Sequence, residues 1–112
     1  MSEKNQGAKL RATAAQLVDD VVSRGHSLDR ALAEHEQRIA TRDHALLRNL
    51  SYGTLRFHWH LQAWLNELLS RPLKKRDSVV NQLLAVGLYQ LSDTRIPDHA
   101  VVSETVEATR YL

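Results

Sequence analysis

The chain has 112 residues, of which 43% are hydrophobic and 25% charged, and its formal net charge is +2. These values are typical of one soluble globular domain and exclude a disordered polymer, and no apolar run approaches the ~18 residues that a membrane-spanning helix needs. Cysteine is absent, which excludes disulfide bonds, thiolate metal ligands and thiol nucleophiles. The N-terminus lacks the apolar segment of a secretory signal, so we expect a cytoplasmic protein.

Apolar spacing predicts two helices in the first part of the chain. The first is expected over residues 9–24, because five apolar residues share one helical face. They are Leu10, Ala14, Leu17, Val18 and Val21. Gly25 is its stop signal, and Ser27 caps a short second helix that ends near residue 40. Residues 1–8 precede this pattern and are expected to form a flexible arm.

A long helical stretch is expected next, from a cap at Thr41 to about residue 70, where Arg71-Pro72 ends it. One face carries a stripe expected in the core: Leu46, Leu50, Gly53, Phe57, Leu61, Trp64, Leu65 and Leu68. The nearly opposite side carries a second row, Arg48, Tyr52, Leu55 and Trp59, with Arg56 at its edge. The pattern leaves open whether the helix breaks near Gly53 or within residues 57–60.

Residues 78–92 form the most apolar segment and are expected to be the central, most buried helix. Gly87 lies within its apolar arc, where the missing side chain would let another helix approach closely. Its narrow polar face consists of Asn81, Gln82, Ala85, Tyr89 and Ser92. A last helix, capped by Asp98, is still running at Leu112, which suggests a fragment of a longer protein. With no useful strand pattern, the expected fold class is all-α.

Six short motifs, in order, resemble one family. They are Ala14-Ala15-Gln16-Leu17-Val18, Asp43-His44-Ala45-Leu46-Leu47, Leu50-Ser51-Tyr52-Gly53-Thr54-Leu55-Arg56, Gly87-Leu88-Tyr89-Gln90-Leu91, Thr94-Arg95-Ile96-Pro97 and Glu104-Thr105-Val106-Glu107. Together they resemble the NusB-like domain, and more narrowly the version at the N-terminus of the RsmB (Sun, Fmu) ribosomal RNA cytosine-C5 methyltransferases. The resemblance implies a helical double bundle over residues 9–112, in which two three-helix layers share long central helices and the C-terminal end is truncated.

The same resemblance implies that the chemistry lies elsewhere. In such enzymes a cysteine attacks the cytosine ring and S-adenosylmethionine supplies the methyl group. This chain has no cysteine and no glycine-rich cofactor loop after a strand, so we expect no catalytic residue and no cofactor within it. S-adenosylmethionine is expected in the missing methyltransferase domain. The expected partners are small-subunit ribosomal RNA and that domain, with no membrane, and the expected state is a monomer.

Two groups of cations are candidates for contacts with RNA phosphates. They are the helix start with Lys4, Lys9 and Arg11, and the loop with Arg71, Lys74, Lys75 and Arg76. The first group resembles the basic start of NusB proteins, where RNA binds, although the cations here are sparser. Each group has a simpler interpretation, a solvated helix start and an exposed interhelical loop respectively.

The row of Arg48, Tyr52, Arg56 and Trp59 has three interpretations: packing of the second bundle layer, docking onto the methyltransferase domain, or stacking of RNA bases.

A metal site is not expected. His58 and His60 lie two residues apart and so point about 200° apart on a helix. The other four histidines lack ligand spacing.

We therefore expect an RNA-binding or positioning domain of an S-adenosylmethionine-dependent 16S ribosomal RNA cytosine-C5 methyltransferase, itself without enzymatic activity. One alternative is a free-standing NusB-type transcription antitermination factor that binds RNA together with a ribosomal protein. A second alternative is an intramolecular docking module without RNA contact.

Overall fold

The computed structural model describes residues 3–112, with side chains from Gln6 onward. Within this range it contains six α-helices and three short 3-10 turns, joined by loops. The helices are α1 (Glu3–Val22), α2 (Leu28–Glu36), α3 (His44–Arg56), α4 (His58–Leu68), α5 (Ser78–Asp93) and α6 (Asp98–Ala108). No strand occurs among these residues, which confirms the all-α prediction. None of the helices described has both the length and the apolar character needed to cross a bilayer.

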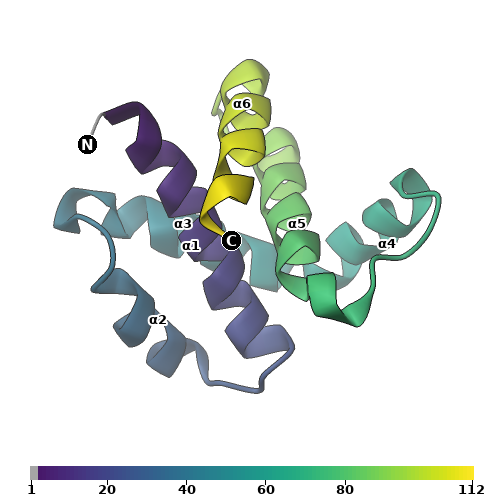
Figure 1. The fold of residues 1–112 in the computed structure, drawn as a ribbon, viewed down its shortest axis with the longest axis horizontal. Coiled ribbons are helices and arrows are strands. Elements are labelled where there is room, and N and C mark those ends of the chain that lie inside the picture. The colour runs from purple at the N-terminus through teal and green to yellow at the C-terminus, as the bar shows by residue number, and fades with distance from the viewer. Residues whose placement is uncertain (1–2) are drawn as a thin grey trace.

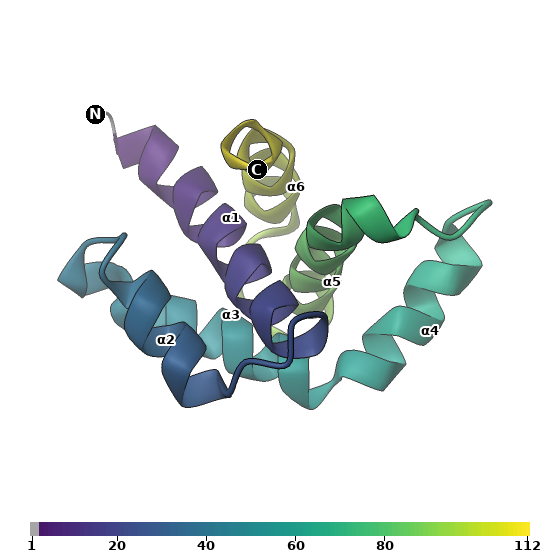
Figure 2. The same ribbon diagram turned by 60° about the horizontal axis from the view of Figure 1, so that its bottom comes forward.

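Helix α1 runs through the middle of the molecule and belongs to both layers of the bundle (Figures 1 and 2). It packs against α2 and α3 on one side and against α5 and α6 on the other. Helix α4 lies outside this centre and packs mainly against α5. The predicted double bundle with shared central helices is therefore confirmed.

Burial on nearly all sides distinguishes α1 from the other helices. The predicted face with Leu10, Ala14 and Leu17 is in the core, but Ala12 and Ala15 on other sides are also buried. Alanine side chains are small enough for neighbouring helices to approach closely on those sides. The prediction that residues 78–92 form the single central helix was therefore incomplete, because α1 shares that position with α5.

The flexible arm predicted over residues 1–8 is helical from Glu3 onward, so this boundary needs correction. The first turns of α1 are held by packing that the local sequence does not reveal. Ala8 is only 1% exposed. A side chain added at Gly7 would meet the carboxylate of Glu104 in α6, so these turns lie against a distant helix. Residues 1 and 2 lie outside the described residues.

The turn between α1 and α2 follows the sequence prediction. Gly25 has a φ of +73°, the left-handed conformation that favours glycine after a helix. The Ser27 hydroxyl accepts a hydrogen bond of 3.2 Å from the Arg30 backbone N–H, as expected of a helix N-cap.

The long helical stretch breaks at Phe57, whose φ of −102° and ψ of 20° separate α3 from α4. The break changes the direction of α4, so that other helices do not cover all of the predicted core stripe. Leu50, Leu61 and Leu65 are buried as expected. In contrast, Phe57 is 37%, Trp64 is 38% and Leu68 is 69% exposed, so the core prediction was wrong for these three residues.

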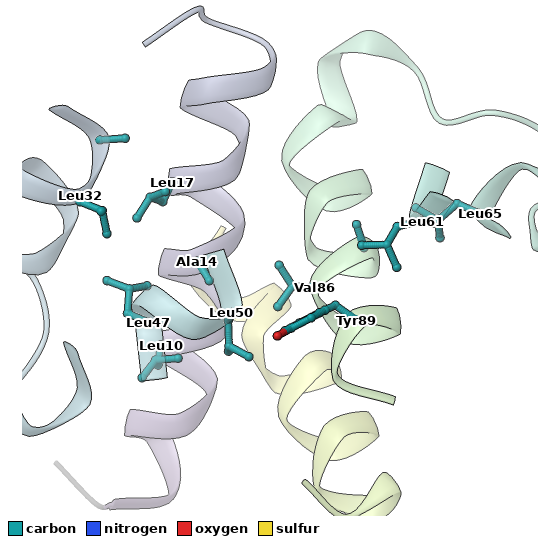
Figure 3. Close-up of a cluster of buried hydrophobic side chains, with 12 residues drawn as sticks. Leu10, Ala14, Leu17, Leu32, Leu47, Leu50, Leu61, Leu65, Val86 and Tyr89 are labelled. Carbon is teal, nitrogen blue, oxygen red and sulfur yellow. The ribbon is translucent and has the colours of Figure 1, made fainter. Parts of the chain in front are cut away.

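The core between α3 and α5 is closed by Tyr89, which Figure 3 shows beside Leu50 and Val86. Tyr89 is only 7% exposed, and its hydroxyl lies 3.4 Å from the Asn49 Oδ1 atom, to which it donates. Its ring fits against Gly53, where an added Cβ would lie 1.9 Å from the Tyr89 Cζ atom. The side of α5 predicted to be polar is thus turned inward in part, because α1 and α3 cover it.

Candidate nucleic-acid interface

The N-terminal group of cations is only partly at the surface. Lys9 is half-buried and lines a small hollow with Arg38 and Asp43. Nearby, Arg42 donates to the side chain of Gln6. Arg38 and Arg42 follow α2 in the chain, so sequence spacing could not associate them with Lys9. The side chain of Lys4 lies outside those described.

Arg11, a candidate for RNA contact, lies in the interior and is only 7% exposed. Its Nε donates to the Gln90 Oε1 atom at 3.2 Å, and its Nη1 donates to the Gly7 carbonyl at 3.3 Å. Burial lowers the pKa of Arg11, while the negative charge of Glu104 acts in the opposite direction. Since the guanidinium joins α1 to α5, the structure removes Arg11 from the candidate phosphate contacts.

The second group of cations occupies the segment between α4 and α5. Arg71, Lys74, Lys75 and Arg76 are all exposed. Arg76 lies 4.0 Å from the Asp77 carboxylate, whereas residues 6–112 place no carboxylate within ion-pair distance of the other three. Figures 1 and 2 show this segment at the end of the molecule opposite the N-terminus. The two groups therefore form separate surfaces.

A cleft of about 420 Å³ lies beside the second group. Lys74 and Lys75 line it from the loop, and His58 and Trp59 line it from the start of α4. Trp59 is 83% exposed, an unusual degree for the largest apolar side chain. The helix break at Phe57 separates Trp59 from the row of Tyr52 in which the sequence placed it. The fold thus brings Trp59, from the predicted aromatic row, next to the cations of the loop, which the sequence treated as a separate set.

The remaining members of that row lie elsewhere. Arg48 forms an ion pair with Glu36 of α2, and the hydrogen bond from Arg48 lowers the pKa of that carboxyl group. Tyr52 and Arg56 line a different hollow, and the Arg56 guanidinium lies 5.5 Å from the centre of the Phe57 ring. Arg48 therefore has a structural partner, and Tyr52 and Arg56 are not part of the cleft.

Burial lowers the pKa of His58 below its ordinary value of 6.5, so the folded protein binds this proton less readily than the unfolded chain does. Stability should therefore fall as the pH drops below about 6.5 towards the lower folded pKa, and it should be retained above that range. We expect the Tm of the parent to fall more between pH 7.5 and pH 5 than that of His58→Gln. The exposed His99→Gln serves as the control, and equal slopes for His58→Gln and the parent would contradict the prediction.

One group of possible metal ligands occurs among the described residues, although the sequence spacing did not indicate it. Ligand atoms of Asp20, His26 and Glu34 lie within 4.8 Å of one another. Both carboxylates already have cationic or imidazole partners. Asp20 lies 2.7 Å from His35 Nε2, and Glu34 lies 3.2 Å from Arg30 Nε. The group is thus part of an ion-pair network between α1 and α2.

A second groove, of about 260 Å³, lies between α4, α5 and α6. Its lining includes Leu68, Leu91, Val102 and Val106, all substantially exposed. These side chains offer no group that could recognise a phosphate or a base edge. This groove is therefore distinct from the candidate nucleic-acid surface.

The fold and the surface define an all-helical double bundle that presents a cationic loop beside an exposed tryptophan. The chain belongs to the NusB family, whose family model matches residues 8–112. This finding confirms the resemblance seen in the sequence motifs.

The chain is also similar to several curated proteins named ribosomal RNA small subunit methyltransferase B. The protein from Vibrio vulnificus is 48% identical over 103 residues, which cover 92% of this chain and 24% of the relative. The protein from Shewanella oneidensis is 46% identical over 104 residues, with the same coverage. The protein from Citrobacter koseri is 45% identical over 98 residues, which cover 88% of this chain and 23% of the relative. This chain therefore spans about a quarter of the length of these relatives.

Proposed function

We propose that this chain is the RNA-binding and positioning domain of an S-adenosylmethionine-dependent 16S ribosomal RNA cytosine-C5 methyltransferase. The names of the relatives support this proposal over a free-standing antitermination factor. The described residues contain no strand, and hence no strand-to-helix glycine turn of the kind that holds a nucleotide cofactor. We therefore assign no step of methyl transfer to them.

The observation that carries the proposal is the exposed cationic loop, in which Arg71, Lys74, Lys75 and Arg76 fall within six residues. Lysine and arginine side chains can replace the counterions of RNA phosphates, and of these four only Arg76 has a carboxylate within ion-pair distance among residues 6–112. Such contacts attract and orient RNA without reading its sequence. The domain would thereby hold ribosomal RNA while another part of the protein performs the reaction.

Replacing these four cations by alanine should weaken binding to a fragment of small-subunit ribosomal RNA about 10- to 1000-fold. The slope of log affinity against log salt should become shallower by about 3, because each lost phosphate contact contributes about 0.7–0.9. Fluorescence anisotropy at several salt concentrations measures both quantities. The substitutions lie in an exposed segment, and circular dichroism checks that the helices persist.

A matched control replaces four exposed arginines elsewhere, Arg24, Arg30, Arg95 and Arg110, and so removes the same net charge. This control should lose much less affinity than the loop variant. Equal losses in both variants would show that only overall charge matters. Unchanged affinity in the loop variant would reject the proposal and favour the docking module without RNA contact.

A further inference from the structure

The cleft beside Trp59 contains an unusual group of polar atoms. His58 Nδ1, Gln62 Nε2 and Gln82 Oε1 are each buried without a hydrogen-bond partner among residues 6–112, and all three residues line this cleft. Burying a polar atom without a partner is unfavourable, so such atoms are rare in native proteins and call for an explanation. These three residues line one cleft, where small side-chain rotations would bring their polar atoms within reach of a polar ligand.

Trp59 stands at the same cleft with its indole almost fully exposed. The His58 ring contacts it edge-on, with ring centres 4.9 Å apart and planes inclined by 70°. This contact restricts the orientation of the indole and leaves its surface open to solvent. An exposed, oriented aromatic face is the feature on which unpaired bases stack in single-stranded RNA recognition.

The groups around the cleft match the parts of one nucleotide. The indole of Trp59 offers a stacking face, and the amides of Gln62 and Gln82 offer a donor and an acceptor for a base edge. Lys74 and Lys75 line the same cleft, and their ammonium groups suit a phosphate. The cleft volume of about 420 Å³ lies within the range of small-molecule sites.

We infer that this cleft binds one unpaired nucleotide of the RNA, whose base stacks on Trp59 and pairs with the glutamine amides while Lys74 and Lys75 hold its phosphate. This inference rests on the proposed function and makes it more specific. A base inside a duplex is stacked on both faces and cannot enter such a cleft. The domain therefore prefers single-stranded or bulged RNA.

The test uses this chain with Trp64→Phe, so that Trp59 is the sole tryptophan. The probes are a pyrimidine-rich RNA of about twelve nucleotides, which is within the site sizes of single-strand binders, and the same strand annealed to its complement. The single strand should quench the Trp59 emission, and the duplex should not. In the parent chain, Trp59→Ala should weaken single-strand binding about tenfold without changing the salt slope, whereas Trp59→Phe should retain most of the affinity.

Tyr52→Ala is the matched control, because Tyr52 is also an exposed aromatic residue, 46% exposed, but lies outside the cleft. The Tyr52→Ala protein should bind the single strand with the affinity of the parent.

If Trp59→Ala also binds the single strand with the affinity of the parent, or if it weakens binding to duplex and single strand equally, the inference is wrong. In either case, a loss of affinity in the four-cation variant would leave the proposed function intact. If the cation variant also binds like the parent, both proposals fail, and Trp59 is better explained as a contact for another protein segment.

Discussion

Replacing Gly53 by alanine should destabilise the domain by about 2–3 kcal/mol, the usual cost of overpacking a core. The added Cβ would lie 1.9 Å from the Cζ atom and 2.4 Å from the hydroxyl oxygen of Tyr89. The tyrosine ring is rigid and 7% exposed, so these atoms can move only if the whole ring leaves its place beside Leu50 and Val86. On an open helix surface the same substitution would instead stabilise by about 1 kcal/mol.

Urea denaturation followed by circular dichroism measures this loss, and Gly7→Ala is the matched control. A Cβ at Gly7 would lie 2.6 Å from the Glu104 carboxylate, but that flexible side chain can rotate away. We expect a change within about 1 kcal/mol for the control. Combining Gly53→Ala with Tyr89→Leu should give less than the sum of the two separate losses, because the clash is removed. A Gly53→Ala protein as stable as the parent would contradict the assigned packing of α3 on α5.

Arg11→Ala should cost about 2–3 kcal/mol in stability and leave the RNA affinity of the folded protein unchanged. The substitution removes the donor to Gln90, a residue that is 0% exposed, and leaves the Gln90 Oε1 atom without this partner. Hydrogen bonds from charged groups contribute about 1.5–3 kcal/mol. The lost aliphatic stem adds a packing defect between α1 and α5.

Chemical denaturation and RNA titration of the same preparations separate the two roles. Arg11→Met retains most of the side-chain volume and should recover the packing part of the loss but not the hydrogen bond. Lys9→Ala, at a half-buried position of the same helix, is the matched control and should change stability by less than about 0.5 kcal/mol. If the Arg11→Ala protein is as stable as the parent but binds RNA more weakly, Arg11 acts as a surface cation, and this result would contradict its position between α1 and α5.

The sequence predicted the features that depend on local spacing. Gly25 and Ser27 ended and began helices at the expected residues, and the apolar face of Leu10 and Leu17 reached the core. Gly87 also behaved as expected, since an added Cβ would lie 3.3 Å from the Thr105 hydroxyl oxygen of α6. These properties follow from backbone sterics and helical periodicity, which act over a few residues.

The features that the sequence did not predict depend on how distant elements meet. Arg11 was taken for a surface cation because the alanines around it do not reveal that a second layer covers them. Trp59 was assigned to the row of Tyr52 because the sequence left open whether the long helix breaks near Gly53 or within residues 57–60, and no glycine or proline marks the break at Phe57. The cleft is lined by the end of α1, by α4 and α5 and by the loop between them, so no sequence spacing could show it.

The shared position of α1 also determines how the domain unfolds. Because Ala14 and Leu17 pack with α2 and α3 in the same core that includes Val86 and Tyr89 of α5, neither layer keeps a closed interior when α1 leaves. Partial opening of one layer alone would therefore expose apolar surface of the other. The domain should consequently behave as a single cooperative unit, with the outer helix α4 as the element best able to open locally.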